Sequence, residues 1–185
     1  MGRLHPAVFM DRDGVVSEEA GYVTSPEQLK IYPFSAQAVQ RLKDNGWKCI
    51  IISNQSAVAR GMISEEELAP IHRKLMKELP IDDIYYCPHY PPENEEVYPY
   101  NIYCTCRKPG IGLILKAVKE HGIDLKKSYM IGDRASDIMA GRNAGLKTVL
   151  VCTGYGPQRL EQEVKPDLVY PNLEQFVNHL LTKEE

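Results

Sequence analysis

The sequence lacks the charge blocks and the long apolar runs of nucleic-acid-binding and membrane proteins. It contains no run of five like charges, and its 22 Lys and Arg residues against 25 Asp and Glu residues give a net charge of −3, so we expect no polyanion-binding arm. Apolar runs such as residues 49–52 and 149–152 are far shorter than the about 20 residues that span a bilayer. Residues 1–9 contain no apolar signal core. We therefore expect a cytoplasmic protein that binds neither nucleic acid nor a membrane.

The chain also lacks a linker, an internal repeat and a low-complexity segment. Its 185 residues, 43% of them hydrophobic, are enough for a single domain with its own core. We therefore predict one domain over residues 1–185, and we expect it to be a monomer.

Short apolar runs and helical periodicities alternate along the chain. Strands are predicted at residues 7–10, 48–52, 83–87, 129–132, 148–152 and 168–170, and helices at 34–43, 64–79, 111–120, 135–144 and 173–181. Ser64 and Glu67 form a predicted capping box, and residues 55–63 are predicted to be a loop. The alternation predicts an α/β protein, a Rossmann-like parallel sheet in three layers with helices on both faces. No sizeable insertion follows Gly14 or Asn54, so no large cap domain is expected.

Polar motifs follow three of the predicted strands. Residues 11–14 follow the first strand, residues 53–55 follow the second, and Asp133 directly follows the strand at 129–132. Ligands of open parallel sheets bind beyond the carboxyl ends of the strands. The sheet is therefore predicted to gather these motifs into one pocket.

The residue types in these motifs suit phosphoryl transfer. Of the two carboxylates Asp11 and Asp13, one can attack phosphorus while the other protonates the departing oxygen. Because carboxylates and phosphate repel each other, this chemistry needs Mg²⁺ between them, with a further carboxylate such as Asp133 or Asp137 as a ligand. Lys108 is a candidate to neutralise the charge of the transferring group.

Each of these motifs is ambiguous alone. Asp11 and Asp13 also fit a turn with solvated acids, Lys108 fits a surface lysine, and Ser53 fits a cap at a strand end. In order, however, Asp-Arg-Asp-Gly, Ser-Asn-Gln, Arg-Lys-Pro and Gly-Asp-x-x-x-Asp resemble the four motifs of the haloacid dehalogenase superfamily of phosphatases.

A second group of residues has the spacing of a metal site. Cys87 and His89, then Cys104 and Cys106, offer three thiolates and one imidazole, a Cys₃His set that suits a closed, structural Zn²⁺ site. Zinc would organise the long loop between them, which otherwise lacks periodicity. The alternative is a set of reduced surface thiols with an exposed histidine. The many tyrosines near this loop are expected to pack it, and residues 154–157 are predicted to be a turn.

Over residues 7–154 the sequence resembles the D-glycero-D-manno-heptose 1,7-bisphosphate 7-phosphatases. The related histidinol-phosphate phosphatases share the aspartate motif and the zinc loop, but they usually differ after Asn-Gln. The resemblance to the heptose enzymes rests on the following segments: Asp-Arg-Asp-Gly, Gly21-Tyr22-Val23, Ser53-Asn54-Gln55-Ser56, Ala59-Arg60-Gly61, Cys87-Pro-His89, Cys104-x-Cys106-Arg107-Lys108-Pro109 and Gly132-Asp133.

This resemblance implies a set of roles. Asp11 would be the nucleophile and Asp13 the proton donor, and Mg²⁺ would be held by Asp11, Asp133 and the backbone carbonyl of Asp13. Ser53 and Lys108 would stabilise the transferring phosphoryl group. The implied substrate contacts are Asp11, Arg12, Asp13, Glu19, Ala20, Gly21, Tyr22, Ser53, Asn54, Gln55, Ser56, Arg107, Lys108 and Arg134.

The expected partner is a small phosphorylated sugar. A bisphosphate needs cations away from the metal, and Arg60, Arg107 and Arg134 are the candidates for binding the phosphate that is retained. Three functions stay open at this point: the heptose bisphosphate phosphatase, the same chemistry on histidinol phosphate or another small phosphomonoester, and a catalytically idle relative that binds a phosphorylated metabolite.

Overall fold

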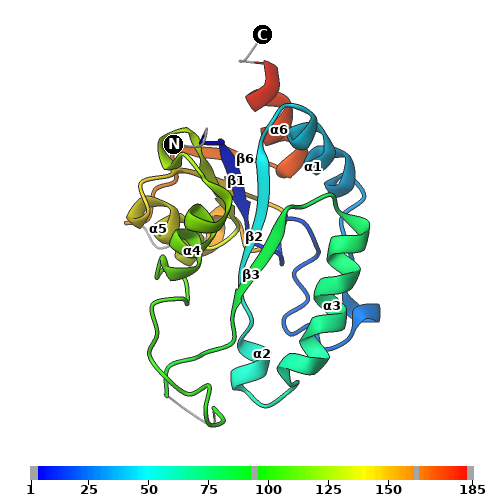
Figure 1. Cartoon of the computed structure of the whole chain (residues 1–185), viewed down its shortest axis with the longest axis vertical. Coiled ribbons are helices and arrows are strands. Elements are labelled where there is room, and N and C mark those ends of the chain that lie inside the picture. The colour runs from blue at the N-terminus through cyan, green and yellow to red at the C-terminus, as the bar shows by residue number, and fades with distance from the viewer. Residues whose placement is uncertain (1–3, 93–95, 161–162, 183–185) are drawn as a thin grey trace.

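The computed structural model describes residues 4–92, 96–160 and 163–182. A single sheet runs through its middle, with helices on both sides (Figure 1). The six strands, each parallel to its neighbours, lie in the order β3-β2-β1-β4-β5-β6. They are β1 (Ala7–Met10), β2 (Lys48–Asn54), β3 (Asp83–Cys87), β4 (Tyr129–Gly132), β5 (Lys147–Val151) and β6 (Leu168–Tyr170). The predicted α/β class is confirmed.

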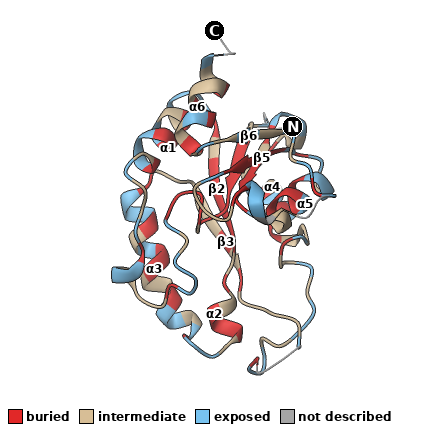
Figure 2. Cartoon of the chain, turned by 180° about the vertical axis from the view of Figure 1, so that it is seen from behind, coloured by how far each residue is buried: buried red, intermediate tan, exposed pale blue. Residues whose placement is uncertain are grey.

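Helices cover both faces of the sheet. They are α1 (Ser35–Asp44), α2 (Ser56–Ala59), α3 (Glu65–Glu78), α4 (Gly112–His121), α5 (Ala135–Asn143) and α6 (Leu173–Thr182). Apolar side chains of α1, α3 and α6, such as Val39, Leu75 and Phe176, share one core cluster with Ile51 of β2. Helix α4 packs on the other face, where Ile114 lies in a second cluster, and Figure 2 shows the buried strands between these two layers. The three-layer arrangement and the absence of a large cap agree with the sequence prediction.

Local structure differs from the prediction in the segment after β2. The strand extends to Asn54 because Asn54 pairs with Cys87 of β3, and the short helix α2 lies inside the predicted loop 55–63. The predicted capping box is present, since Ser64 and Glu67 each accept a hydrogen bond from the other's backbone N–H. Three short 3₁₀ segments, at Pro26–Gln28, Leu125–Lys127 and Pro157–Arg159, were not predicted.

The neighbouring strands β1 and β4 mark the point where the chain changes direction across the sheet. Their register aligns Met10 with Ile131, and the backbone N–H of Asp11 donates to the carbonyl oxygen of Ile131 over 3.0 Å. Residues that follow β1 and β4 therefore leave the sheet side by side, at the edge where ligands of such folds bind. In the part of the chain that the structure describes, no helix is both long enough and apolar enough to cross a membrane.

Candidate active site

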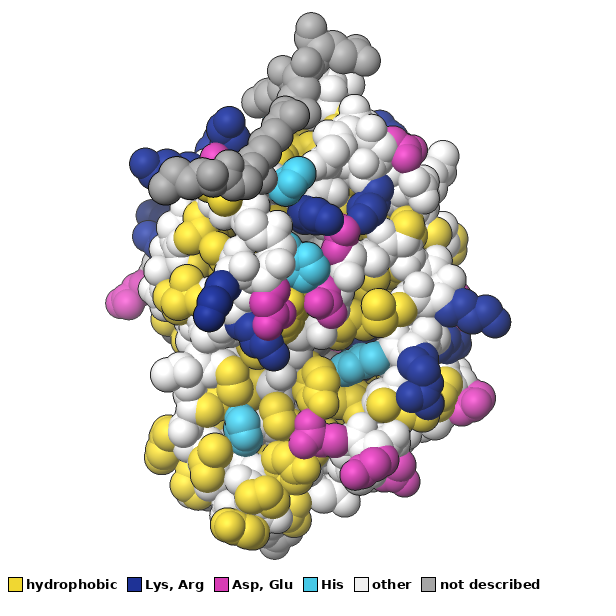
Figure 3. Space-filling view, viewed as in Figure 1, with side chains coloured by type: hydrophobic (Ala, Val, Ile, Leu, Met, Phe, Trp, Pro, Cys, Tyr) yellow, Lys and Arg dark blue, Asp and Glu magenta, His cyan; other side chains and the backbone are white. Residues whose placement is uncertain are grey.

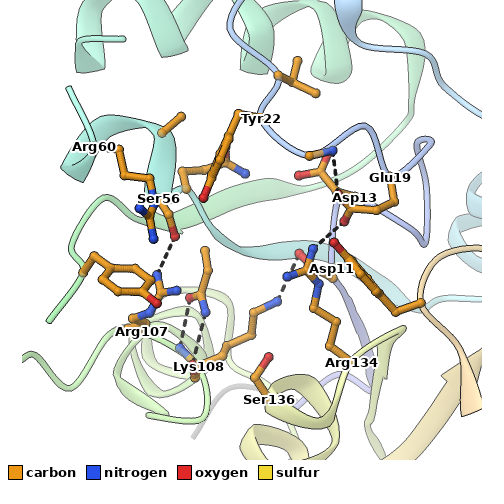
Figure 4. A pocket seen from close by; sticks show the side chains of 17 residues that line it. Asp11, Asp13, Glu19, Tyr22, Ser56, Arg60, Arg107, Lys108, Arg134 and Ser136 are labelled. Carbon is orange, nitrogen blue, oxygen red and sulfur yellow. Dashed lines mark hydrogen bonds and ion pairs between the residues drawn. The ribbon is translucent and has the colours of Figure 1, made fainter. Parts of the chain in front are cut away.

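A cavity of about 350 Å³ opens at the carboxyl ends of the central strands. Segments far apart in the sequence line it, as Figure 4 shows. It brings together eleven of the predicted site residues: Asp11, Asp13, Glu19, Gly21, Tyr22, Asn54, Gln55, Ser56, Arg107, Lys108 and Arg134.

Lys108 lies at the centre of the charged groups of this cavity. Its Nζ is 3.0 Å from Asp11 Oδ1 and 2.6 Å from Asp137 Oδ1, and it donates a hydrogen bond to the carbonyl oxygen of Ile52 over 2.7 Å. Burial alone would lower the pKa of Lys108, but the two carboxylates outweigh burial and raise it. Lys108 is therefore a fully charged ammonium held at a fixed position.

Asn54 fixes the main chain that carries Lys108. The Asn54 side chain accepts from the N–H of Lys108 over 3.0 Å and donates to its carbonyl oxygen over 3.1 Å. This pair of bonds connects the end of β2 to the loop before α4. The position of the lysine thus depends on a strand of the sheet, although Lys108 itself lies in a loop.

Three carboxylates, those of Asp11, Asp133 and Asp137, lie close together beside Lys108. Their oxygens lie within 4.8 Å of one another, and all three residues are buried. Burial, followed by the charges of Asp11 and Asp137, raises the pKa of Asp133 to about 7. One oxygen of Asp133, Oδ2, accepts from the N–H of Tyr155 over 2.8 Å, whereas the buried Oδ1 has no hydrogen-bond partner. Crowded oxygen ligands with an orphaned buried atom are the donor set expected for a hard divalent cation.

Glycines leave room around these carboxylates. A Cβ added to Gly154 would lie 2.1 Å from Asp133 Oδ2, and one added to Gly14 would lie 2.4 Å from the same oxygen. Gly14 also has a φ of +81°, which favours glycine. At Gly132 an added Cβ would lie 2.0 Å from the Cβ of Asp137. The glycines of all three segments are thus required by the close approach of the carboxylates.

The Arg12 side chain is buried and is not among the residues that line the cavity. It is 1% exposed, and its Nε and Nη2 donate to the Asp13 carboxylate over 2.7–3.1 Å. The hydroxyl of Ser17 lies 3.4 Å from Asp13 Oδ1. Arg12 therefore orients Asp13, and its contact with substrate stays a prediction.

Two further predicted contacts also lie outside the cavity lining. Ala20 is exposed, and Ser53 is 1% exposed, with its Oγ accepting from Gln55 Nε2 over 2.7 Å. The Ser53 oxygen thus accepts a hydrogen bond from a side chain two positions further along the chain.

Arginines also line the cavity, at two different places. At one place Arg134 pairs with Glu19 over 2.6 Å and stacks on Tyr155, and Glu19 and Asp133 raise its pKa despite burial. At the other place Arg107 donates to Ser56 Oγ over 2.9 Å and to a backbone carbonyl over 3.1 Å. The cavity thus has an acidic floor and cationic walls.

The predicted Cys/His residues form a compact cluster. Cys106 Sγ lies 3.0 Å from Cys87 Sγ, 3.2 Å from Cys104 Sγ and 3.3 Å from His89 Nδ1. All four ligand atoms lie within 4.8 Å of one another, which is the size of a tetrahedral site with Zn–S bonds of about 2.3 Å. Burial raises the pKa of the Cys87 thiol, and the nearby thiols add to this effect. The cluster holds the two ends of the loop 88–105 together.

Comparison with known proteins identifies the family. The HAD-hydrolase-like family model matches residues 105–176. A D-glycero-D-manno-heptose-1,7-bisphosphate 7-phosphatase of Thermosynechococcus vestitus is 40% identical over 96% of this chain and 96% of its own length. The D-glycero-beta-D-manno form of Haemophilus ducreyi is 38% identical over 94% of this chain and 97% of its own. The chain belongs to the heptose 1,7-bisphosphate 7-phosphatase family. The family predicted from the sequence is confirmed.

Solved structures agree with this assignment. The D,D-heptose 1,7-bisphosphate phosphatase of B. bronchiseptica, crystallised with magnesium and phosphate, superposes with a TM-score of 0.84 at 32% identity, covering 96% of this chain and 99% of that one. The phosphatase described here thus shares its fold with a relative that binds a divalent cation and phosphate.

Sequence reasoning missed several residues that line the cavity of this phosphatase. Tyr90, Ser136 and Tyr155 line it, and Tyr155 also supplies the N–H bonded to Asp133. The predicted turn at 154–157 therefore belongs to the site. Its position directly after β5, at the carboxyl edge of the sheet, was the available signal.

The tyrosines of the loop 88–105 have two different environments. Tyr100 donates to Glu65 Oε1 over 3.0 Å, as expected for a side chain that packs the loop. Tyr98 and Tyr103 are 88% and 76% exposed, so the predicted packing role is wrong for these two. Figure 3 shows hydrophobic side chains gathered at the lower end of the face where this loop lies in Figure 1.

Proposed function

We propose that this phosphatase removes the 7-phosphate of D-glycero-D-manno-heptose 1,7-bisphosphate, with Asp11 as the nucleophile. The observation that carries the proposal is the Asp11 carboxylate in the cavity, 3.0 Å from the ammonium of Lys108. A carboxylate beside a fixed cation can approach a phosphoryl group whose negative charge would otherwise repel it. The names of the relatives support the choice of substrate.

Asp11 would attack phosphorus to form an aspartyl phosphate. The bond between phosphorus and the sugar O7 breaks, and Asp13 donates a proton to that oxygen, so that the sugar leaves as an alcohol. Asp13, now a carboxylate, then takes a proton from a water that attacks the aspartyl phosphate and releases inorganic phosphate. Arg12 and Ser17 support the position that this role needs, because they hold the Asp13 side chain at the cavity.

Lys108 would stabilise the equatorial phosphoryl oxygens. Its Nζ has one acceptor in the backbone and two carboxylates around it, so its orientation does not depend on substrate. A positioned cation contributes more than a mobile one because it needs no reorganisation during the reaction. Ser53 stays a predicted contact to the same oxygens, and the rest of the predicted substrate set is proposed on the same basis.

Asp11, Asp133 and the backbone carbonyl of Asp13 would hold Mg²⁺. The fit rests on the unpartnered Asp133 Oδ1, on the oxygen-only donors and on the space left by Gly14 and Gly154. When bound, the cation neutralises charge shared between the nucleophile and the phosphoryl oxygens. The B. bronchiseptica relative crystallised with magnesium and phosphate supports this assignment.

Cys87, His89, Cys104 and Cys106 would hold a structural Zn²⁺. Three soft sulfur donors and one imidazole suit zinc, and a full set of four protein ligands gives no open position for catalysis. Arg107 and Lys108 come directly after Cys106. The zinc would therefore contribute indirectly, by fixing the loop that leads into the cavity.

The test is phosphate release from purified protein with and without Mg²⁺. The substrates are both anomers of the heptose 1,7-bisphosphate, with histidinol phosphate and an aryl phosphate as comparisons. We expect Mg²⁺-dependent release and a kcat/KM for one heptose anomer at least about a hundredfold above the comparisons. Similar slow rates on every substrate would support phosphatase chemistry but contradict the choice of substrate. No phosphate release at all would favour a catalytically idle protein that binds a phosphorylated metabolite.

A further inference from the structure

Residues 152–156, which follow β5 and which we call the β5 turn, contact the loop that carries Asp13. The hydroxyl of Thr153 donates to the carbonyl oxygen of Gly14 over 2.6 Å, and Gly14 directly follows Asp13 in the chain. In the sheet β5 lies beside β4, and β4 separates it from β1. Strand pairing therefore does not bring Thr153 to Gly14, and the side-chain hydrogen bond joins two loops across the end of β4.

The β5 turn also holds Asp133, which follows β4. The backbone N–H of Tyr155 donates to Asp133 Oδ2 over 2.8 Å, and the backbone N–H of Gly156 donates to the carbonyl oxygen of Asp133 over 3.1 Å. Both the side chain and the main chain of Asp133 are thus bound by the turn. The β5 turn therefore connects the loop after β1 with the loop after β4, and Thr153 provides the bond to the first of them.

Thr153 is itself held in place. The hydroxyl of Tyr32 donates to the carbonyl oxygen of Thr153 over 2.9 Å, and the Tyr32 ring stacks on Phe34 with the ring centroids 5.1 Å apart. The main chains at the contact lie close together, since a Cβ added to Gly154 would lie 2.8 Å from the Cα of Gly14. Thr153 is therefore bound through its carbonyl and binds the neighbouring loop through its hydroxyl.

The two loops that Thr153 connects carry proposed ligands of the divalent cation. One ligand is the carboxylate of Asp133, and another is the backbone carbonyl of Asp13, one residue before Gly14. Magnesium requires near-ideal distances to its oxygen ligands, so the spacing between the two loops affects how tightly the cation binds. Thr153 is not among the residues that line the catalytic cavity, so its influence on the site is indirect.

We propose that Thr153 is a positioning residue of the cation site, whose hydroxyl sets the spacing between Asp133 and the main chain at residues 13–14. The proposal rests on the proposed function, which assigns the Mg²⁺ ligands. The Asp13 carboxylate is held separately by Arg12 and Ser17. Loss of the Thr153 hydroxyl should therefore lower the affinity for the cation and leave the proton donor in place.

The experiment measures Mg²⁺ binding by calorimetry, without substrate, on protein dialysed free of Mg²⁺. Thr153→Val removes the hydroxyl and keeps the branched side chain, and we expect its Kd for Mg²⁺ to rise about tenfold. Thr153→Ser keeps the hydroxyl and should bind Mg²⁺ as the wild type does. Thr182→Val is the matched control, because the Thr182 hydroxyl also donates to a backbone carbonyl, over 2.9 Å, but at the end of α6. At saturating Mg²⁺, kcat of Thr153→Val should stay near the wild-type value.

Tyr32→Phe tests the same contact where Thr153→Val fails to fold. It keeps the ring and removes the hydroxyl that binds the carbonyl of Thr153, so it should also raise the Kd for Mg²⁺. A lower melting temperature with an unchanged Kd in both variants would mean a purely structural role and would overturn the inference. Equal losses of affinity in Thr153→Ser and Thr153→Val would overturn the role of the hydroxyl.

The wild-type protein separates this inference from the proposed function. Wild-type protein that binds Mg²⁺ but releases no phosphate would overturn the proposed function, whereas a raised Kd in Thr153→Val would still support the positioning role. Wild-type protein that binds no Mg²⁺ would overturn both.

Discussion

The Asp11 carboxylate lies 3.0 Å from the ammonium of Lys108, and the same ammonium lies 2.6 Å from Asp137. One cation therefore serves two carboxylates, while Asp133 has no lysine or arginine within ion-pair distance among the described residues. The cluster carries more negative than positive charge at neutral pH. A divalent cation bound at this cluster would balance the excess negative charge.

Asp11→Asn should abolish turnover without unfolding the protein. The amide cannot attack phosphorus, so we expect kcat to fall by at least about a thousandfold. The substitution removes one ion pair with Lys108 but also removes repulsion with two neighbouring carboxylates, so the melting temperature should stay near that of the wild type. Asp44→Asn, at an exposed carboxylate outside the cavity, should keep full activity. Retained turnover in Asp11→Asn would contradict the assignment of the nucleophile.

Gly154→Ala should raise the Mg²⁺ concentration needed for activity. The new Cβ would lie 2.1 Å from Asp133 Oδ2, so the carboxylate must move away from its present position. We expect the half-activating Mg²⁺ concentration to increase about tenfold or more. Gly145→Ala is the control, because a Cβ there meets nothing within 4 Å. The Gly145→Ala variant should lose some stability, because residue 145 has a positive φ, and it should keep the Mg²⁺ dependence of the wild type. If Gly154→Ala also keeps the wild-type Mg²⁺ dependence, that result would argue against a cation at Asp133.

Purified protein should contain about one zinc per chain by elemental analysis. Removal of the metal by a strong chelator should free the four ligands and expose the loop 88–105 to proteases. Cys104→Ser should lower zinc content in the same way, whereas Cys152→Ser, at an exposed cysteine outside the cluster, should not. Protein without zinc but with full protease resistance would show that hydrogen bonds alone order the loop.

Protonation of His72 on unfolding should lower the free energy of unfolding in mild acid. Burial, with a smaller contribution from Arg12, lowers the pKa of His72 from 6.5 to about 3. Between these values the unfolded chain binds a proton that the folded chain does not, so the free energy of unfolding falls as pH drops below about 6.5. His72→Phe should remove this loss, about 2 kcal/mol at pH 5. Urea unfolding at pH 7 and pH 5 measures it, and parallel losses in both proteins would show that His72 is protonated in the folded state.

Strand positions could be predicted from the sequence because a strand buried on both faces leaves a continuous apolar run. The predicted bounds of β1, β3, β4 and β6 agree with the structure. The end of β2 was missed because Ser53 and Asn54 are polar, and only their pairing with β3 places them in the strand. Helix α2 was missed because four residues are too few to show a periodicity.

The sequence predicts which residues belong to the site where the end of a strand places them. It does not predict the direction in which a side chain points. Asp11 and Asp133 follow adjacent strands, so topology alone brings them together. No sequence pattern says that Arg12 turns inward to Asp13, since either direction is open to a residue after a strand. The hydrogen bond from Thr153 to the loop after β1 is tertiary, and the local sequence around Thr153 carries no trace of it.

The cavity floor and its far wall belong to parts of the chain that can change separately. The floor follows β1 and β4, in the middle of the sheet, whereas Tyr90 and Arg107 lie in the connection between β3 and α4. The Cys/His cluster closes that connection on itself, so substitutions between its ends leave strand register intact. Changes within this connection before Arg107 can therefore alter one wall of the cavity without altering the carboxylates that follow β1 and β4.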